Sequence, residues 1–531
     1  MKTLPYQLQS SVNTTPNRIA ISDRGNDITY EQLRETTKQI ASGLFAQGVR
    51  RGDKIGIWLP NIAAYLEMFL ACAEIGATVV SINTKFKSFE MADIVTRSGC
   101  TMLVLWPDFK NIPFLDILSE ISEGGLKSLQ SVVFYSENEN KRPTLPKCLA
   151  GKDIISFEQL RQSEITTLPK ISEDDGLVVF TTSGTTGKPK FVLHTQYSVT
   201  IHAEEVAQHF GYQERDCHLL QVNPLCGTFG LTQALAGFAG CGTVYCLPVF
   251  EPVEACRIIQ EEAITDINGS DDMYAMLLKQ ATEDKPFPDL KYAGFAAFNP
   301  ALSDLVETAT ERGVHLMGLW GMSEVQAFVT HQDPSASIAD RKRAGGRLIA
   351  SAAKIRITDP DTGAVLLYGE QGELQIKTSS QMVGYLNNEE ATSKSITKDG
   401  YIKTGDLCVQ HDDRNFTFLS RMGDVLRLGG YLTDPTEIET CLGEMDGVMQ
   451  AQVVGVQTSK GARAYGYVVL SETGAVTENQ MLKYCRDNLA GYKVPARIEF
   501  LTEFPTTQSA NGVKIQRAKL REDAQSSIDA R

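Results

Sequence analysis

The chain has 531 residues, more than one hydrophobic core usually organises, so two or more domains are expected. Hydrophobic residues make up 42% and charged residues 22% of it, proportions typical of soluble globular proteins. The formal net charge of −14 argues against binding to nucleic acid or to an anionic membrane through bulk charge, but it leaves room for a local basic pocket that binds a phosphate-rich small molecule.

The cysteines and the apolar segments indicate a cytoplasmic protein. Eleven cysteines, spread from Cys72 to Cys485 without a CxxC pair, predict a reduced protein with buried thiols. The first residues of the sequence have no apolar core of signal-peptide length. The stretch from Cys217 to Phe250 has no Asp, Glu, Lys or Arg and is long enough to span a membrane. Because it also holds two prolines, five glycines and several amides and hydroxyls, we interpret it as buried helix and strand.

The first half of the chain alternates helical and strand patterns. Thr29 and Gln32 predict a capping box in front of a helix that Gly48 ends. The next expected elements are a strand at 54–59, a helix at 61–75 and a strand at 77–82. Glu67 and Glu74 lie two turns apart and are expected on a solvent-facing side of that helix. This alternation predicts a largely parallel sheet with helices on its faces.

The second half changes in texture after about residue 340, where short strands dominate. A domain joint is expected near residues 420–424. It would divide a large N-terminal domain, residues 1–420, from a small α+β domain, residues 421–531.

The sharpest motif is the segment 181–190, TTSGTTGKPK, which follows an apolar run typical of a buried strand. Its small residues let backbone N–H groups converge on an anion, and its hydroxyls and two lysines add donors and positive charge. It differs from a Walker A loop in the spacing of its glycines and in the proline at position 189. We interpret it as a phosphate-binding loop; the plainer alternative is a flexible polar turn.

This loop resembles the phosphate-binding signature of the adenylate-forming superfamily, which includes acyl- and aryl-CoA synthetases, firefly luciferase and the adenylation domains of peptide synthetases. Further segments of the chain are similar to this family in the same order: 319–324 (LWGMSE), 381–392, 403–406 (KTGD), 421–439 and 505–517. Any one of them would be weak, but six ordered matches are specific. The resemblance is greatest to the acyl-CoA synthetase and fatty-acid–CoA ligase branch. It implies an α/β fold: a large N-terminal domain of parallel-type sheets with helices and a short-stranded β subdomain, followed by a small, mobile α+β lid.

The resemblance also implies roles for single residues. The Trp320 ring would stack on adenine, and Asp406 and Arg421 would bind the ribose. Ser323 would hydrogen-bond the α-phosphate, and Glu324 would hold Mg²⁺, a hard cation that prefers carboxylate and phosphate oxygens. Taken alone, Trp320 would be interpreted as a core aromatic and Asp406 as a turn residue. The other residues expected to bind ATP or AMP are Thr181, Thr182, Ser183, Gly184, Thr185, Thr186, Lys188, Ala296, Ala297, Gly321 and Met322.

Two residues of the small domain would carry the lid's part of the chemistry. Lys514 matches the family's C-terminal lysine, which bridges the substrate carboxylate and the α-phosphate, and it is expected to be catalytic together with Ser323. The family usually has Gly directly before this lysine, whereas this chain has Val513; Lys519 is the less favoured alternative. Gly423 stands where the family has the pivot of its lid rotation, usually Asp or Lys.

The acyl pocket is expected around the segment that follows Pro224. The residues assigned to it are Leu225, Cys226, Gly227, Gly230 and Phe298. The family often has an aromatic–His pair after this proline, and this chain has neither residue. In the phosphate loop, the family often has Gly after its Pro-Lys, where this chain has Phe191. Small residues in a charge-free stretch favour an apolar acid, because each buried methylene contributes about 0.8 kcal/mol. His194 either flanks the phosphate loop or has a structural role.

Together these features predict an ATP-dependent acid–thiol ligase. It would form an acyl-adenylate with release of pyrophosphate and transfer the acyl group to coenzyme A, with ATP, Mg²⁺ and CoA as its cofactors. A medium- or long-chain fatty acid is the preferred substrate; an aryl or alicyclic acid is the alternative. Other open readings are the loading of a carrier-protein thiol, a luciferase-like oxidation and a catalytically silent nucleotide-binding relative. Whether the chain forms a homodimer is left open.

Overall fold

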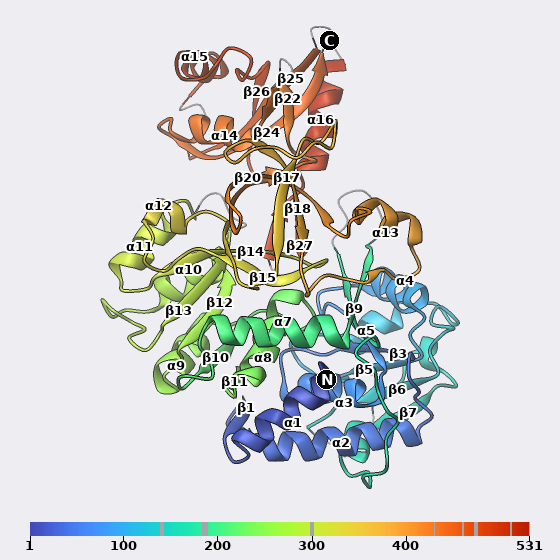
Figure 1. The fold of residues 1–531 in the computed structure, drawn as a ribbon. Coiled ribbons are helices and arrows are strands. Elements are labelled where there is room, and N and C mark those ends of the chain that lie inside the picture. Colours follow the sequence, from blue (N-terminus) through green and yellow to red (C-terminus); the bar gives the residue numbers. More distant parts are fainter. Residues whose placement is uncertain are drawn as a thin grey trace.

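Two large sheets and the helices around them make up most of the chain, and a small domain follows at the C-terminus (Figure 1). The computed structural model describes residues 1–137, 143–182, 189–297, 302–428, 431–458, 461–471, 476–509 and 512–529. The predicted α/β class, with short strands after residue 340 and a separate small α+β domain, is confirmed. The boundary at 420/421 and the mobility of the small domain stay predictions.

The first sheet changes from parallel to antiparallel pairing at β14. Its parallel part runs through β11, β10, β12, β13 and β14, and its antiparallel part holds the short strands predicted after residue 340. In spatial order the strands are β17 (Lys354–Thr358), β18 (Gln371–Lys377), β20 (Ile402–Asp412), β21 (Asn415–Arg421), β16 (Gly345–Leu348), β15 (Gln326–His331), β14 (Leu316–Met322), β13 (Tyr292–Ala296), β12 (Asp266–Ser270), β10 (His218–Gln221), β11 (Thr243–Cys246), β1 (Ile19–Asp23) and β2 (Asn26–Thr29).

The second sheet holds eight strands and is parallel from β8 through β7. In spatial order they are β19 (Gly384–Tyr385), β9 (Phe191–Thr195), β8 (Gly176–Thr181), β4 (Thr78–Ser81), β3 (Lys54–Trp58), β5 (Met102–Leu105), β6 (Ser131–Phe134) and β7 (Asp153–Ser156). The strands predicted at 54–59 and 77–82 are β3 and β4, which confirms the parallel sheet expected from the alternating pattern.

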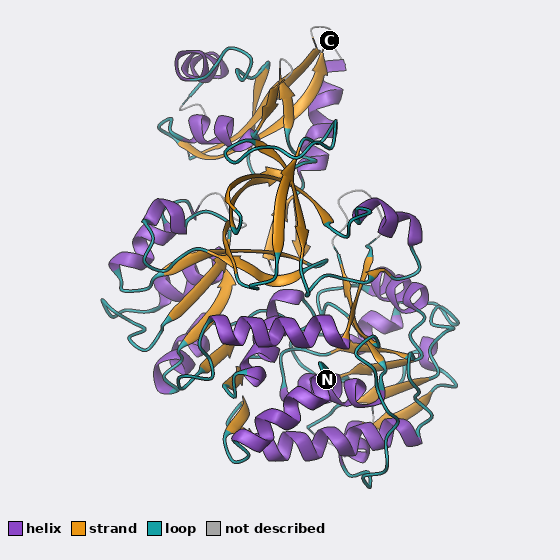
Figure 2. Ribbon diagram, in the orientation of Figure 1, coloured by secondary structure: helices purple, strands orange, loops and turns teal. Residues whose placement is uncertain are grey.

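Helices lie between the two sheets and on their outer faces (Figure 2). Helix α3 packs on β1 of the first sheet and on β3 and β4 of the second, while α8 packs on β10, β11 and α7. The helices of the large part are α1 (Leu4–Thr14), α2 (Tyr30–Ala46), α3 (Ala63–Ile75), α4 (Ser88–Ser98), α5 (Phe114–Ser119), α6 (Phe157–Arg161), α7 (Gln196–His209), α8 (Thr228–Ala239), α9 (Pro252–Glu261), α10 (Asp271–Gln280), α11 (Leu305–Glu311), α12 (Ile338–Arg341) and α13 (Glu389–Ser395), with a 3₁₀ turn at Lys147–Leu149.

The predicted start of α2 is confirmed, but the predicted wet face of α3 is wrong. Thr29 caps α2 in a complete capping box with Gln32. Helix α3 is buried almost all round, and Glu67 is only 2% exposed. Its carboxylate accepts hydrogen bonds from Arg161, at 2.5 Å from Nη2, and Glu74 pairs with Arg34. The sequence showed acids at helical spacing; it did not show the arginines of other elements that neutralise them.

The charge-free stretch from Cys217 to Phe250 forms β10, α8 and β11 in the core, as predicted. No helix within the described residues is long and apolar enough to cross a membrane. All eleven cysteines are buried free thiols, which confirms that part of the prediction.

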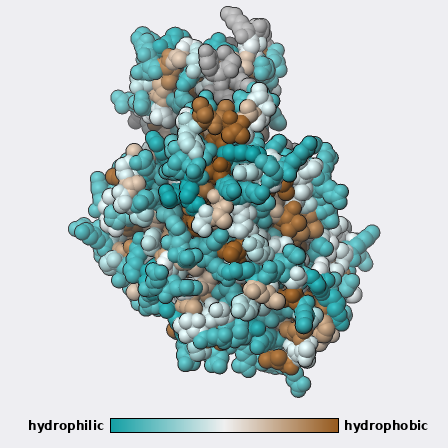
Figure 3. Space-filling view, viewed as in Figure 1, coloured by the Kyte–Doolittle hydropathy of each residue, from teal (hydrophilic) through white to brown (hydrophobic). Residues whose placement is uncertain are grey.

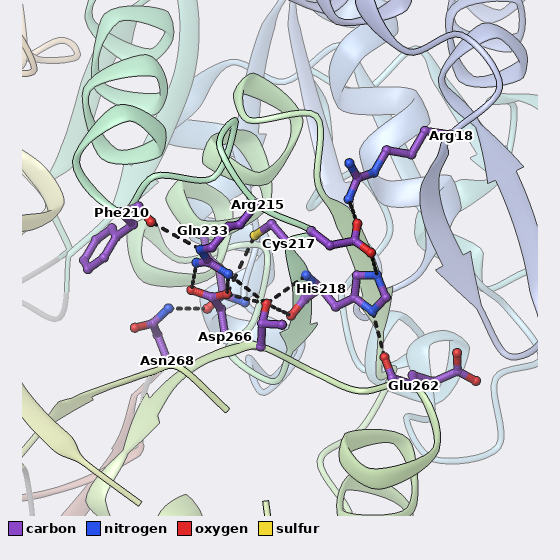
Figure 4. A network of polar contacts seen from close by, with 11 residues as sticks. Arg18, Phe210, Arg215, Cys217, His218, Gln233, Glu262, Asp266 and Asn268 are labelled. Carbon is purple, nitrogen blue, oxygen red and sulfur yellow. Dashed lines mark hydrogen bonds and ion pairs between the residues drawn. The ribbon is translucent and has the colours of Figure 1, made fainter. Parts of the chain in front are cut away.

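A polar cluster ties β10 and β12 to the chain that enters β10 (Figure 4). Arg215 donates through its two terminal nitrogens to both carboxylate oxygens of Asp266, at 2.7 and 2.8 Å, and Asp266 is fully buried. Thr265 and Cys217 donate to the same carboxylate. A buried carboxylate with this many donors is a fixed structural point, because losing one partner would leave a buried charge unpaired.

The described part of the small domain contains a three-stranded sheet with helices packed on it and two separate strand pairs, β22–β23 and β27–β28. Its elements are β22 (Leu426–Leu428), β23 (Tyr431–Thr433), α14 (Pro435–Gly443), β24 (Val448–Thr458), β25 (Gly461–Leu470), α15 (Glu478–Asn488), β26 (Arg497–Leu501), β27 (Thr506–Ser509), β28 (Gly512–Ile515) and α16 (Arg517–Asp529). Strand β25 pairs with β24 antiparallel and with β26 parallel. The view in Figure 3 shows a mainly hydrophilic face with an apolar area near the joint between the two parts.

Candidate active site

The predicted nucleotide-binding residues come from strand ends of both sheets. Thr181 ends β8 of the second sheet, and Ala296 ends β13 of the first. Trp320, Gly321 and Met322 form the end of β14, where the pairing changes from parallel to antiparallel. Carboxyl ends of parallel strands are where α/β proteins place their ligands.

The phosphate loop is held at its base, although most of it lies outside the described residues. The backbone N–H of Thr182 donates to the Lys190 carbonyl at 3.0 Å, and the Lys190 N–H donates to the Thr182 hydroxyl at 3.2 Å. Strands β8 and β9, which flank the loop, pair antiparallel. The predicted residues Ser183, Gly184, Thr185, Thr186 and Lys188 lie outside the described residues, as does Phe298.

Arg97, which the sequence analysis missed, anchors the end of this loop. Its Nη2 donates to the carbonyl of Pro189 at 3.1 Å, and its guanidinium carbon lies 4.4 Å from the centre of the Phe191 ring. Arg97 also pairs with Asp93 one turn earlier on α4. That spacing was the only signal in the sequence, and it is typical of an ordinary surface helix pair. Phe191, noted as a departure from the family, is buried and contributes this ring.

Asp406 lies at the centre of the candidate ribose site. Its Oδ2 accepts a hydrogen bond from Nε1 of Trp320 at 2.9 Å, and its Oδ1 lies 2.7 Å from Nη1 of Arg421. The two strands align Asp406 directly opposite Arg421. Burial raises the pKa of Asp406 to about 6, although the Arg421 charge and the Trp320 hydrogen bond act against this rise. The structure therefore brings together the three residues that the resemblance assigned to adenosine.

Glu324, the predicted Mg²⁺ residue, is buried and held by a tyrosine whose ring contacts a lysine. The Tyr385 hydroxyl donates to its Oε1 at 2.7 Å, and Lys190 Nζ lies 4.7 Å from the centre of the Tyr385 ring. One buried carboxylate suits Mg²⁺, a hard cation that can take its remaining ligands from phosphate and water. Within the described chain no group of three or more His, Cys, Asp or Glu side chains is arranged to hold a metal without such outside ligands.

The backbone around Ser323 is fixed from two sides. His194, fully buried, donates from Nε2 to the Ser323 carbonyl at 2.7 Å, and burial lowers the pKa of His194 to about 4, so the ring stays neutral. The Met382 N–H donates to the Glu324 carbonyl at 2.7 Å. His194 thus has a structural contact that positions the Ser323–Glu324 segment.

Gly321 is required by close packing in the same segment. A Cβ there would lie 2.7 Å from both the Cα of Ala327 and the carbonyl oxygen of Gln326 on β15. Any other residue would push β15 away from β14 and so move Trp320. This gives a physical reason for glycine beside the candidate adenine-binding residue.

The segment assigned to the acyl pocket is more tightly packed than expected. Leu225 and Cys226 are buried, and Gly227 is the N-cap of α8. We expected Gly230 to leave room for an acyl chain, but there is no open space where its side chain would point. A Cβ there would lie 2.3 Å from the Pro224 carbonyl oxygen. Gly230 lets α8 approach the backbone before it. Burial raises the pKa of Cys226 to about 12, which fits the view that its thiol is not a nucleophile.

The two residues assigned to the lid, Gly423 and Lys514, lie near the start and near the end of residues 421–531. Lys514 is in β28, paired with Thr507 of β27; its side chain lies outside the described part. Gly423 follows β21, and the Arg521 guanidinium of α16 donates to its carbonyl at 2.7 Å. No described residue beyond its chain neighbours comes within 4 Å of a Cβ built at Gly423.

A family model described as AMP-binding enzyme matches residues 8–386, and a second, described as AMP-binding enzyme C-terminal domain, matches residues 437–511. The chain belongs to the AMP-binding enzyme family. The resemblance inferred from the six ordered motifs is thereby confirmed, and each match falls within one of the two parts of the fold.

Several AMP-binding enzymes are similar to this chain over nearly its whole length. A mitochondrial medium-chain acyl-CoA ligase, ACSF2 of Danio rerio, is 28% identical over 98% of this chain and 88% of its own. A methyl-dioxo-octahydroindenyl-propanoyl:CoA ligase of Rhodococcus jostii (strain RHA1) is 28% identical over 98% of both chains. The o-succinylbenzoate CoA synthetase of Bacillus subtilis, solved in complex with ATP and a magnesium ion, superposes with a TM-score of 0.79 at 26% identity, covering 97% of this chain and 98% of that one.

Proposed function

We propose that this AMP-binding enzyme is an ATP-dependent acid–CoA ligase that works through an acyl-adenylate. The observation that carries the proposal is the buried carboxylate of Asp406 on β20, held between Trp320 and Arg421. A buried acceptor beside an aromatic ring suits a nucleoside, whose hydroxyls donate hydrogen bonds and whose base stacks. The similar proteins named as acyl-CoA ligases support the same reaction class.

In the first step, an oxygen of the substrate carboxylate attacks the α-phosphorus of ATP, and the bond to pyrophosphate breaks. Two anions must approach each other, so fixed positive charge and N–H donors lower the barrier. We assign this task to the phosphate loop and to Lys514, with Ser323 near the α-phosphate. Mg²⁺, held by Glu324, would neutralise part of the triphosphate charge.

In the second step, the thiol of CoA loses its proton to solvent, its sulfur attacks the acyl carbonyl carbon, and AMP leaves with the bonding electron pair. Adenylation makes this step favourable because AMP is a far better leaving group than hydroxide. Between the two steps the small domain would rotate. We place the pivot of this rotation at Gly423, near the joint between residues 1–420 and 421–531. The cytoplasmic location and a homodimer stay predictions from the sequence.

The acid is a medium- or long-chain fatty acid in this proposal, with an aryl or alicyclic acid as the alternative. Leu225, Cys226 and Gly227 offer no charged group, so chain length and shape would select the substrate. The similar ligases act on acids of each of these classes, as their names state.

The deciding experiment measures pyrophosphate release over a panel of fatty, aryl, alicyclic and amino acids, with and without CoA. We expect release with an apolar acid and thioester formation only when CoA is present. If pyrophosphate is released but the thioester forms on a carrier protein and not on CoA, the protein is a carrier-loading enzyme and the CoA-ligase proposal is wrong. No release with any acid, in a protein that binds ATP, would support the catalytically silent alternative.

A further inference from the structure

The indole of Trp320 is fixed at two points. Its N–H donates to Oδ2 of Asp406 at 2.9 Å, and its ring meets Phe416 edge-on, with ring centres 5.3 Å apart and planes at 86°. Trp320 is only 6% exposed and Phe416 is fully buried. A tryptophan side chain has two rotatable bonds, so these contacts leave it little freedom.

The hydrogen bond depends on the curl of the first sheet. Trp320 is on β14 and Asp406 on β20, and three strands lie between them in the sheet order. Four strand spacings in a flat sheet would separate the two by about 19 Å. A 2.9 Å contact therefore forms only because the antiparallel part of the sheet bends round on itself. The contact is a property of this tertiary arrangement, and the local sequence of neither strand requires it.

The two oxygens of Asp406 are used unequally. Oδ2 accepts the N–H of the buried Trp320, whereas Oδ1 faces the guanidinium of Arg421, with Nη1 2.7 Å away. The Arg421 side chain is 54% exposed, so this second contact is open to solvent and to a ligand. Arg421 also donates to the carbonyl of Thr404. The rigid, buried contact that orients the carboxylate is thus the one from Trp320.

We propose that Trp320 is a positioning residue for ribose recognition: its N–H holds Oδ2 of Asp406 so that Oδ1 is presented to a ribose hydroxyl. The proposal rests on the proposed function, in which Asp406 binds the ribose of ATP. It gives Trp320 a task that a stacking ring alone does not have. Oδ1 faces the half-exposed side chain of Arg421, so a ribose hydroxyl can share or replace that contact while Oδ2 stays fixed by Trp320.

The consequence is selection of ribonucleotides over deoxyribonucleotides. A site built to accept a hydrogen bond from a hydroxyl discriminates strongly against the analogue that lacks it, because its buried acceptor then stays unpaired. A stacking ring treats ATP and its deoxy analogues alike, because the adenine is the same. Discrimination by the sugar therefore separates the positioning role from a purely stacking or packing role.

The test compares Trp320→Phe, Asp406→Ala and the packing control Phe416→Leu. Phenylalanine keeps an aromatic ring and removes the N–H. Isothermal titration with ATP, 2′-deoxyATP and 3′-deoxyATP measures the preference of each variant for the ribose. We expect Trp320→Phe to reduce that preference roughly tenfold, the size of one lost hydrogen bond to a charged group, with little change in binding of the deoxy analogue that lacks the hydroxyl bound by Oδ1. Phe416→Leu should weaken all three nucleotides alike.

The outcomes separate this inference from the proposed function. If Asp406→Ala leaves the preference for ATP unchanged, Asp406 does not bind ribose and the proposed site fails. If Asp406→Ala lowers the preference but Trp320→Phe does not, the ribose site stands and the positioning role is wrong. Should Trp320→Phe not fold, site-specific incorporation of benzothienylalanine at 320 replaces the N–H by sulfur at nearly the same shape.

A pH profile gives a second readout that packing would not move. A hydrogen bond to the ionised carboxylate favours that form, so losing the Trp320 N–H should raise the pKa of Asp406. The acid limb of ATP binding should then shift to higher pH in Trp320→Phe and stay in place in Phe416→Leu. An unshifted limb in Trp320→Phe would overturn the inference.

Discussion

The hydroxyl of Tyr385 donates a hydrogen bond to Oε1 of Glu324 at 2.7 Å, across 61 residues of sequence. Both side chains are buried, and Lys190 Nζ lies against the Tyr385 ring. A carboxylate held at one oxygen has a defined direction for its other oxygen. The contact therefore prepares Glu324 to bind a cation in one orientation.

We predict that Tyr385→Phe will raise the Mg²⁺ concentration needed for ATP binding roughly five- to tenfold, since one hydrogen bond to a charged group is lost. Titration calorimetry with ATP over a Mg²⁺ series measures this directly. Glu324→Gln should raise the requirement further. Tyr368→Phe, which alters an exposed tyrosine in the turn before β18, serves as the control. An Mg²⁺ requirement that is the same in Tyr385→Phe and the unaltered protein would contradict the prediction.

Asp406 predicts a pH dependence of nucleotide binding. Its pKa in the folded protein is about 6, above the ordinary value of 3.8, because burial disfavours the charge. Protonation removes the negative charge and turns one acceptor oxygen into an O–H donor, so ATP affinity should fall as pH drops through about 6. Asp406→Asn should weaken binding and flatten this acid limb. ATP titrations between pH 5 and 8 decide it, and an acid limb that persists in Asp406→Asn would assign it to another group.

The same shift affects the stability of the ligand-free protein in the opposite direction. Because the folded state holds the Asp406 proton more tightly than the unfolded state, this group's contribution falls as pH rises from about 4 to about 6. Asp406→Asn should therefore lose that part of the pH dependence. Thermal unfolding of the two proteins across this window measures it.

The sequence predicted the parts of this fold that local patterns determine. Thr29 and Gln32 form the predicted capping box, because both partners lie within one helical turn. The phosphate loop follows a buried strand, as its apolar run indicated. Glu67 was misplaced on a wet face because its partner, Arg161, lies on another helix. The charge balance of a buried acid depends on tertiary contacts that the spacing of residues along one helix does not contain.

The candidate site shows the same division. Trp320 and Asp406 were found as separate motifs, but their mutual hydrogen bond depends on the curl of the sheet. Arg97 was missed because its contact with Pro189 joins two elements far apart in the sequence. Gly230 was assigned to a pocket because it is small, whereas its size serves the approach of α8 to Pro224. Residue type alone did not distinguish an open space from a close backbone contact.

Gly227 offers a test of the acyl pocket. Its backbone at φ −103° and ψ 155° is extended, so leucine can adopt it without strain. We predict that Gly227→Leu will shift the preference toward shorter acids and leave ATP affinity unchanged. Pyrophosphate release across a chain-length series is the measurement, and Gly227→Ala is the matched control. A chain-length profile that does not move would remove this segment from the pocket.

Lys514 tests the assignment of the adenylating lysine. We predict that Lys514→Ala will reduce pyrophosphate release by several orders of magnitude, because the ammonium that bridges the approaching carboxylate and the α-phosphate is lost. Thioester formation from supplied acyl-AMP should be largely spared. Lys519→Ala is the control: Lys519 lies on α16 and pairs with Asp523, so its loss should alter little. The reverse pattern would show that Lys519 is the family's lysine.

Gly423 is the predicted pivot of the small domain, and Arg521 holds it in the pose seen here. The Arg521 guanidinium donates to the Gly423 carbonyl at 2.7 Å and pairs with Asp424 at 3.2 Å. Rotation about the backbone bonds of Gly423 would turn this carbonyl and break the first contact. Glycine has the widest φ/ψ freedom, and the absence of neighbours within 4 Å of a Cβ there means that a side chain would not clash in this pose.

We therefore predict that Gly423→Pro will separate the two half-reactions. Proline fixes φ near −65° and removes the N–H, so the chain can no longer change its torsion at this residue. Pyrophosphate release in a single turnover should continue, while thioester formation from supplied acyl-AMP should fall by at least tenfold. Gly423→Ala, which has room for its Cβ and keeps the N–H, should slow the exchange only slightly. Equal loss of both half-reactions in a folded Gly423→Pro variant, or no loss in either, would place the pivot at another residue, with Asp424 the next to test.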